Sequence, residues 1–336
     1  MDFVNALVLF SNFVIVPALS YGSQLALGAI GVTLVYGILR FANFAYGDLM
    51  AFGTMFTILF TWYFQSIGIS LGVLPTALLA IPFAIVITIL FSLLIDKFVF
   101  SYYRIKKSPS VTIAMVSLGV MFVTNAIVRI IIGPYDRRFF DGERFIIRAN
   151  EFKEMTGLNE GLAIKSTQVL TIVITIIVVS LLFWFLNKTK TGKSMRAYSD
   201  NEDLALLSGI SPARVVMITW IIVAILATFA GSLYGLDKSF KPFTYFSLLL
   251  PIFASAIVGG IGNPVGALVG GYVIAFSEII ITYAYKKFFA YLLPESLEPN
   301  TLVQFLSTDY KFAVSFSILV IVLLVRPTGI LKGKTL

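Results

Sequence analysis

The sequence predicts an all-α fold, a polytopic transmembrane helical bundle with roughly 8–10 membrane segments, some of them broken or re-entrant. Two observations carry this prediction. Hydrophobic residues make up 58% of the 336 residues and charged residues only 12%, about half the share found in soluble domains. Charged residues are also absent from long windows, including 3–39, 49–95 and 242–277. Each of these windows can hold two spanning helices, because one span needs about 20 apolar residues.

The composition also excludes several classes of chemistry. The chain contains no cysteine and no histidine, which excludes disulfides, thiolate–metal sites and Ser-His-Asp triads, and we expect no bound metal. Aromatic residues alternate with apolar rather than basic residues, so the sequence gives nucleic-acid binding no support. The start, MDFVNALVLF, has an acidic residue where a signal peptide has basic ones, so we expect the first apolar run to be retained.

Ten apolar segments can be drawn along the chain, and we treat residues 1–336 as a single transmembrane domain. The segments cover about 3–19, 25–41, 47–65, 73–96, 110–133, 167–187, 213–236, 246–262, 263–285 and 311–325. Those near 25–47 and 246–270 are short and interrupted by glycine. Eight full spans with additional re-entrant or broken helices are therefore the alternative.

Three polar stretches set the predicted orientation. Residues 96–107 are mainly basic, the loop 134–166 balances six basic residues against six acidic ones, and 188–214 carries five basic residues. Alternating the ten segments puts the first and third stretches on one side of the membrane, together with Arg40, Arg326, Lys332 and Lys334. The positive-inside rule makes this side cytoplasmic and puts 134–166 on the opposite side.

The tripeptide Gly192-Lys193-Ser194 matches the end of a nucleotide-binding P-loop. The full motif, G-x-x-x-x-G-K-[ST], begins with a glycine that lets the loop wrap its backbone around phosphate. Asn187 stands at that position, and the apolar run before it is too long for the core strand that leads into a P-loop. We therefore expect this chain to bind no nucleotide.

The segment 194–211, SMRAYSDNEDLALLSGIS, predicts a short surface helix in the cytoplasmic loop. The triplet SDN at 199–201 is typical of a helix start, and Gly209 of a helix end in a left-handed conformation. The segment is either an ordinary amphipathic connector or a docking helix that fits a groove on a soluble partner. A modest apolar surface is supplied by Leu204, Leu206 and Leu207.

A family resemblance rests on this segment and on three other stretches. The order E-x-x-A-x-x-x-G-I at 202–210 resembles the coupling-loop motif of ABC importer permeases. Its flanks, GKSMRAYSDN and SPARVVMITWIIVAILATFAGSLYG, are similar to the LivH-type permeases of branched-chain amino acid importers. So are LGAIGVTLVYGILRFANFAYGDLMAFG (27–53), AIVGGIGNPVGALVGGYVIAFSE (256–278) and RPTGILKG (326–333). One departure is Tyr46, where the family commonly has histidine, which weakens any role for a titrating group there.

The resemblance implies a function and a set of partners. The chain would be a permease subunit of an ABC importer in the bacterial inner membrane, with 134–166 as a periplasmic loop. It would bind no cofactor, and ATP would be used by two separate cytoplasmic ABC ATPase subunits. A second homologous permease and a periplasmic substrate-binding protein would complete the importer. The residues that couple the permease to the ATPases would be Glu202, Ala205, Leu206, Gly209, Ile210 and Ser211.

The sequence leaves alternatives open for the transported substrate, for the energy source and for the class of protein. The family implies branched-chain or related amino acids, but urea and short-chain amide importers use closely similar permeases. An ion-coupled secondary transporter would need ionisable residues at mid-bilayer, and the sequence offers very few. An integral-membrane enzyme is disfavoured because the chain has no histidine, cysteine or carboxylate cluster.

Polar residues interrupt the apolar region at 41–48, FANFAYGD. Intramembrane polar groups often mark substrate routes, and broken helices present backbone groups to small solutes. This view makes Asn43, Tyr46 and Gly47 candidates for the translocation pathway. The alternative is a tight cytoplasmic turn, with Arg40 and Asp48 at the water interface.

Glycines cluster in the stretch 259–271. Small residues let helices approach closely in lipid, so a helix break with close packing is the first interpretation. A permease–permease interface or a pore lining is the second. The residues concerned are Gly259, Gly260, Gly262, Gly266 and Gly270.

Two charged residues lie inside apolar runs. Burying an isolated charge is costly, so each must pair or reach an interface. We expect Glu278 to lie at a helix end near Lys286 and Lys287. Arg129 is expected to extend outward, with Asn125, one turn away, as its hydrogen-bond partner.

Overall fold

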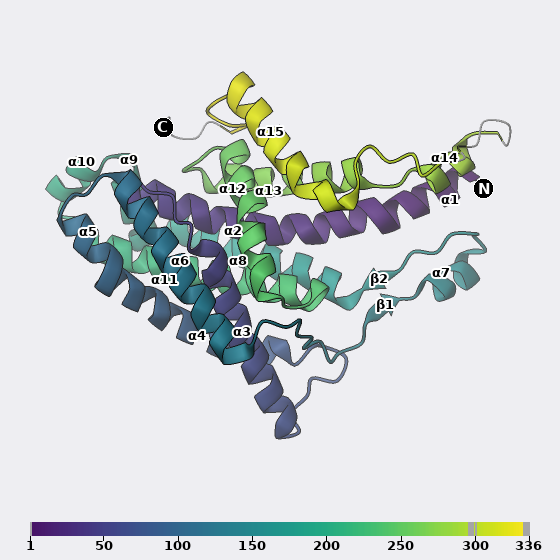
Figure 1. The fold of residues 1–336 in the computed structure, drawn as a ribbon, viewed down its shortest axis with the longest axis horizontal. Coiled ribbons are helices and arrows are strands. Elements are labelled where there is room, and N and C mark those ends of the chain that lie inside the picture. Colours follow the sequence, from purple (N-terminus) through teal and green to yellow (C-terminus); the bar gives the residue numbers. More distant parts are fainter. Residues whose placement is uncertain (1, 295–298, 300, 332–336) are drawn as a thin grey trace.

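The computed structural model describes residues 2–294, 299 and 301–331, which form one helical bundle (Figure 1). Within this part of the chain, eight helices are long and apolar enough to cross a membrane. Its strands, β1 (Phe145–Ile147) and β2 (Ile164–Lys165), form one two-stranded antiparallel hairpin. The predicted all-α polytopic fold is confirmed.

Most helices are joined by short connections. The first half of the chain contains α1 (Asp2–Phe10), the π-helical turn η1 (Ser11–Ile15), α2 (Val16–Leu39), α3 (Tyr46–Ser66), α4 (Ala77–Ile95), the π-helical turn η2 (Asp96–Phe100), α5 (Ser101–Ile105), α6 (Ser110–Ile132) and α7 (Ala149–Thr156). The second half contains α8 (Ser166–Lys188), α9 (Lys190–Asp200), α10 (Glu202–Leu207), α11 (Pro212–Lys238), α12 (Pro242–Gly259), α13 (Pro264–Thr282), α14 (Lys286–Leu292), the 3₁₀ turn η4 (Thr308–Tyr310) and α15 (Lys311–Val325).

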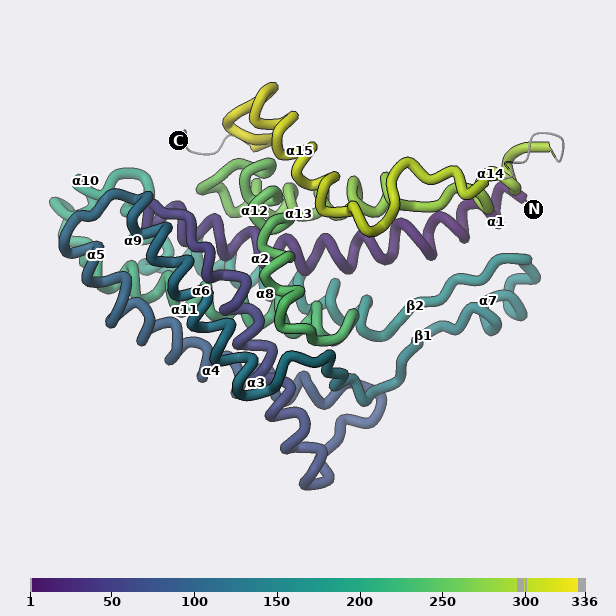
Figure 2. Tube along the Cα trace, in the orientation of Figure 1, coloured from purple at the N-terminus to yellow at the C-terminus, as the bar shows by residue number. Residues whose placement is uncertain are grey.

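The division of the N-terminal region into segments 3–19 and 25–41 was wrong. Residues 2–39 form one continuous helical rod through α1, η1 and α2 (Figure 2). Pro17 has no N–H to donate within the rod, and it lies just after the π-helical turn at the junction with α2. Gly22 does not mark a turn but lets the ring of Tyr272 on α13 pack against α2. At 1.5 Å per residue the rod is roughly 57 Å long, well beyond a hydrocarbon core of about 30 Å.

The helix α3 is long enough to be a membrane segment, with 21 residues. It is not among the eight helices identified by hydropathy, because polar residues such as its threonines and Gln65 lower its mean hydropathy. Including α3, the described part of the chain has nine segments of membrane length. This number lies within the predicted range.

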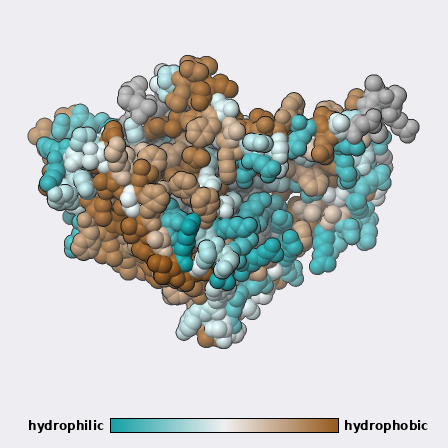
Figure 3. Space-filling model, viewed as in Figure 1, coloured by the Kyte–Doolittle hydropathy of each residue, from teal (hydrophilic) through white to brown (hydrophobic). Residues whose placement is uncertain are grey.

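The two ends of the bundle differ in character. Figure 1 shows α5, α9 and α10 at one end, and the N-terminus, α7, β1, β2 and α14 at the other. The stretches 96–107 and 188–214 therefore lie at the same end of the bundle, and β1, α7 and β2 of the loop 134–166 lie at the other. The tail residues Lys332 and Lys334 lie outside the described residues. Hydrophilic surface gathers at these two ends, and a hydrophobic face lies between them (Figure 3).

Side-chain hydrogen bonds tie the long N-terminal rod and α14 to the hairpin end. Asn5 on α1 accepts hydrogen bonds from the backbone amides of Asn159 (3.2 Å) and Glu160 (3.3 Å) through its side-chain Oδ1. Asn12 accepts one from the amide of Ala163 at 3.0 Å. Tyr291 on α14 donates its hydroxyl to the Glu160 carboxylate at 2.9 Å. The N-terminal part of the rod is thereby joined to the loop 134–166.

The helix α2 forms the centre of the bundle. Nearly all of its residues from Ala18 to Ile38 are buried, because α8, α11, α12 and α13 pack around it. Gly271 on α13 lies against the backbone of Ala26, where a larger residue would collide. Such close approach allows dispersion contacts in lipid, where no hydrophobic drive pulls helices together.

Candidate functional site

The GKS tripeptide lies in the first turn of α9. Thr189 caps this helix by accepting a hydrogen bond from the backbone amide of Gly192 at 3.0 Å. A Cβ atom at Gly192 would collide with the backbone of Phe185 and Leu186 at the end of α8. The glycine is therefore required by the tight corner between two helices, whereas a P-loop follows a strand.

The segment 194–211 spans parts of two short helices, α9 and α10, rather than one. The chain breaks at Asn201, whose side chain caps α10 by accepting a bond from the amide of Leu204 at 3.0 Å. Tyr198 on α9 donates its hydroxyl to the Glu202 carboxylate at 2.6 Å and so holds the two helices together. Burial, and then the bond to this carboxylate, raise the pKa of the Tyr198 hydroxyl above its usual value.

The end of α10 has the predicted geometry. Gly209 adopts a left-handed conformation with φ +78°. Its amide donates to the carbonyl of Leu206, and the amide of Ile210 donates to that of Ala205, both at 3.0 Å. This pattern is the usual glycine-based helix termination. Ser211 then starts α11, with its carbonyl accepting from the amide of Val215 at 3.2 Å.

The exposed surface of α10 differs from the expected one. Ala205 is 3% exposed and packs inside this chain, whereas Leu207 is 85% exposed and Leu204 61%. Leu206 is 44% exposed. Leu204 and Leu207 are three residues apart and therefore share a helix face. We call Leu204, Leu206 and Leu207 the α10 ridge; the sequence placed all three on the apolar surface, but only Leu206 was a candidate coupling residue.

The pathway candidates are packed inside the chain between α2 and α3. The Asn43 side chain is 3% exposed and accepts from the amide of Ala45 at 3.1 Å, which forms a local turn. Tyr46 is fully buried, and its ring lies against Gly31 of α2. Gly47 lies under the carbonyl of Tyr245, where a Cβ atom would come within 2.6 Å.

The placement of Asp48 at a water interface was wrong. This residue is 1% exposed, and its Oδ1 accepts a hydrogen bond of 2.6 Å from the side-chain amide of Asn125 on α6. Asn125 is therefore the partner of Asp48 rather than of Arg129. The Arg129 guanidinium is exposed and lies 6.0 Å from the centre of the Phe243 ring. The only sequence signal for the buried pair was the aspartate at the end of FANFAYGD.

The placement of Glu278 at a helix end beside Lys286 and Lys287 was also wrong. Glu278 is 1% exposed and accepts a hydrogen bond from the hydroxyl of Ser315 on α15. This bond joins α13 to α15, which pack against each other.

The clustered glycines lie where α12 and α13 meet. Gly260 (φ +113°) and Gly262 (φ +84°) make the turn between the two helices. Gly259 and Gly266 touch backbone to backbone, and Gly270 lies against the carbonyl of Ser255. Asn263 caps α13 by accepting from the amides of Val265 (3.1 Å) and Gly266 (3.2 Å).

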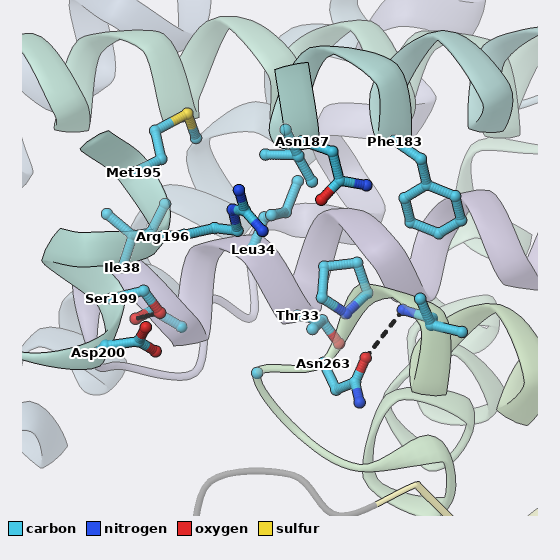
Figure 4. Close-up of a pocket in the computed structure, with 15 residues that line it drawn as sticks. Thr33, Leu34, Ile38, Phe183, Asn187, Met195, Arg196, Ser199, Asp200 and Asn263 are labelled. Carbon is cyan, nitrogen blue, oxygen red and sulfur yellow. Dashed lines mark hydrogen bonds between the residues drawn. The ribbon is translucent and has the colours of Figure 1, made fainter. Parts of the chain in front are cut away.

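A cavity of 420 Å³ opens at the α9–α10 end of the bundle (Figure 4). Its walls come from the last turns of α2 and α8, from α9 and from the α12–α13 turn. This cavity could not be predicted from the sequence, because its walls come from four separate parts of the chain. Among the described residues, no group of three or more Asp and Glu side chains could hold a metal ion.

Comparisons with known proteins agree with this architecture. The model of the family described as branched-chain amino acid transport system / permease component matches residues 14–323. The chain belongs to this family. It is 29% identical over 314 residues to the high-affinity branched-chain amino acid transport system permease protein LivH of Escherichia coli (strain K12), covering 92% of each chain. It is 28% identical to BraD of Pseudomonas aeruginosa, a permease protein described in the same words, covering 94% of each chain.

A more distant organism supplies a third relative. The probable branched-chain amino acid transport permease protein LivH of Methanocaldococcus jannaschii is 29% identical, over 93% of this chain and 90% of the relative. Among solved structures, a chain of PsaBC from Streptococcus pneumoniae gives a TM-score of 0.47 at 11% identity, over 98% of this chain and 93% of that one.

The stretches that carried the family resemblance converge at one end of this permease. The Ser199 hydroxyl donates to the carbonyl of Gly37 at 2.9 Å, and Arg40 donates to the carbonyl of Ser199 at 2.7 Å. The amide of Ile330 in the tail donates to the carbonyl of Val258 at 2.8 Å. A Cβ atom at Gly37 would lie 3.7 Å from the Cα atom of Gly262, so the end of α2 also meets the α12–α13 turn. The end of α2, the segment 194–211, the α12–α13 turn and the tail therefore lie together.

Proposed function

We propose that this multi-pass permease is the membrane-spanning subunit of an ABC importer that carries branched-chain or related amino acids across the bacterial inner membrane. Membership of the permease family supports the proposal, and so do relatives of nearly equal length that are described as branched-chain amino acid permeases. The α9–α10 end faces the cytoplasm and the hairpin end faces the periplasm, in accordance with the basic residues of 96–107 and 188–214.

The importer contains further subunits. A second homologous permease encloses the pathway with this chain, two ABC ATPases supply the energy, and a periplasmic binding protein delivers the substrate. This chain binds neither ATP nor any other cofactor. The observation that carries this arrangement is the α10 ridge, because three exposed leucines on a polar end of the molecule offer an apolar surface for a soluble partner.

Movement of α10 can be transmitted directly to the bundle. Ser199 precedes α10 and is bonded to the end of α2 through Gly37 and Arg40. Because α8, α11, α12 and α13 pack around α2, a displacement of the segment 194–211 acts on the helix at the centre of the bundle. We infer that ATP-driven closure of the ATPases opens and closes the pathway through this connection.

The experiment that tests the proposal is uptake in cells lacking this gene. Restoring the chain should restore energy-dependent uptake of radiolabelled leucine, isoleucine or valine. Restored uptake of urea or short-chain amides, with none of amino acids, would identify the alternative substrate class. Uptake that continues without the ATPase genes would contradict the proposed energy source.

A further inference from the structure

The cavity of 420 Å³ at the α9–α10 end has a size suited to a small solute, since small-molecule sites usually measure roughly 300–1,000 Å³. None of the coupling residues and none of the pathway candidates lines it. The cavity therefore needs an explanation of its own.

Charged side chains occupy one part of the cavity. Arg196 points from α9 toward its centre, and Asp200 lies one turn further along the same helix (Figure 4). None of the ion pairs found within the described residues includes Arg196. A guanidinium in this position can bind a carboxylate through two parallel hydrogen bonds.

Apolar side chains form the neighbouring part of the wall. Leu34 and Ile38 come from α2, Leu186 from α8 and Met195 from α9, and all four are buried. The ring of Phe183 on α8 lies beside them (Figure 4). An apolar group of a ligand would displace water from these surfaces, which favours binding.

A buried hydroxyl in the wall lacks a partner. Most buried threonines in the long helices donate to the carbonyl four residues earlier, as Thr54, Thr57 and Thr61 do. Thr33 on α2 is 1% exposed, lines the cavity, and makes no hydrogen bond within the described residues. An unpaired buried polar group is costly, and a ligand in the cavity would remove that cost.

We propose that this cavity binds an α-amino acid with an apolar side chain. Arg196 holds the carboxylate, Asp200 attracts the ammonium group, and Thr33 bonds one of the polar ends. The ligand side chain lies against Leu34, Ile38 and Met195. The inference rests on the proposed function for its substrate class and for the cytoplasmic location of the site. It adds a site for the imported product at the cytoplasmic end of the permease.

Equilibrium binding of radiolabelled leucine tests the proposal. The intact importer is placed in lipid nanodiscs without its periplasmic binding protein, so that leucine can bind only to the membrane complex. Arg196→Gln should weaken leucine binding at least about tenfold, because a charge-assisted bidentate contact is lost. The matched control is Lys193→Gln, which removes the same charge from an exposed position on α9 outside the cavity. Thr33→Val keeps the side-chain shape and should weaken binding several-fold.

Competition with leucine amide adds a second readout. Leucine amide lacks the carboxylate, so it should compete at least about tenfold more weakly than leucine for the wild-type importer and equally well for Arg196→Gln. Three results would overturn the proposal: no saturable leucine binding at millimolar concentration, equal affinities of Arg196→Gln and Lys193→Gln, or equal competition by leucine and its amide in the wild type. Leucine uptake by the same importer in cells reports separately on the proposed function, which stands if uptake is intact while binding is absent.

Discussion

The substitution Leu207→Asp separates docking of a partner from folding of this chain. Leu207 is 85% exposed at the tip of the α10 ridge, so the change removes almost no contact within the permease. If the ridge docks on an ATPase subunit, burial of this leucine contributes about 1.5–3 kcal/mol. A desolvated, unpaired carboxylate in its place adds a cost of about 1–3 kcal/mol. The sum corresponds to a loss of affinity of at least about hundredfold.

The assay is co-purification of the ATPase subunits with tagged permease, together with uptake of radiolabelled leucine. The variant should reach the membrane at the wild-type level, lose its ATPase subunits and lose uptake. The matched control is Met155→Asp on α7, because Met155 is 84% exposed at the opposite end of the molecule. Ala205→Asp is a poorer test, since Ala205 is buried inside this chain and its loss would disturb α10 itself. If Leu207→Asp retains both its ATPases and its uptake, the ridge is a plain connector and the reasoning fails.

Three further predictions concern other parts of the structure. Gly209→Val should weaken ATPase binding, because a β-branched residue in the left-handed conformation costs more than about 1–2 kcal/mol. Gly209→Asn should be tolerated, because asparagine adopts this conformation more easily. A Cβ atom at this position meets nothing within 4 Å, so equal loss of binding in both variants would show that backbone strain is not the cause. Asp48→Asn should leave uptake intact and insensitive to protonophores while ATP is maintained, whereas abolished uptake would favour ion coupling through the buried carboxylate. Burial opposes ionisation of Asp141, but hydrogen bonds from Thr76 and Gln65 outweigh it and hold the pKa of its carboxyl below its usual value. The ionised form therefore stabilises the fold above the unfolded pKa of about 3.9, and this contribution is lost as pH falls through the lower folded pKa. Thermal melts of Asp141→Asn should show a deficit at neutral pH that disappears in acid, and a deficit independent of pH would contradict the assignment.

Local features of the structure were largely predictable from the sequence. Charge-free windows predicted the spanning helices because no other fold satisfies the backbone of such long apolar runs in lipid. The left-handed end of α10 was predictable because glycine at position 209 is the residue that adopts such a conformation without strain.

Features that depend on distant parts of the chain were not predictable. The division between segments 3–19 and 25–41 was wrong because Gly22, which lies in the gap between them, makes room for Tyr272 on the distant helix α13. Asp48 resembled an interfacial residue because its partner Asn125 lies 77 residues away. Glu278 and Ser315 are 37 residues apart, on different helices. A local pattern carries no information about these pairs, so the buried carboxylates and the cavity emerge only from the packed bundle.

The most direct measurement of the central claim is transport by a reconstituted importer. Proteoliposomes would contain this permease with its partner permease and ATPases, and the binding protein and radiolabelled leucine would be added on the periplasmic side. The account predicts that leucine accumulates only when ATP, the binding protein and this chain are all present. Omission of any one of them should abolish uptake. Accumulation driven by an ion gradient without ATP, or transport of urea and amides but not of leucine, would contradict it.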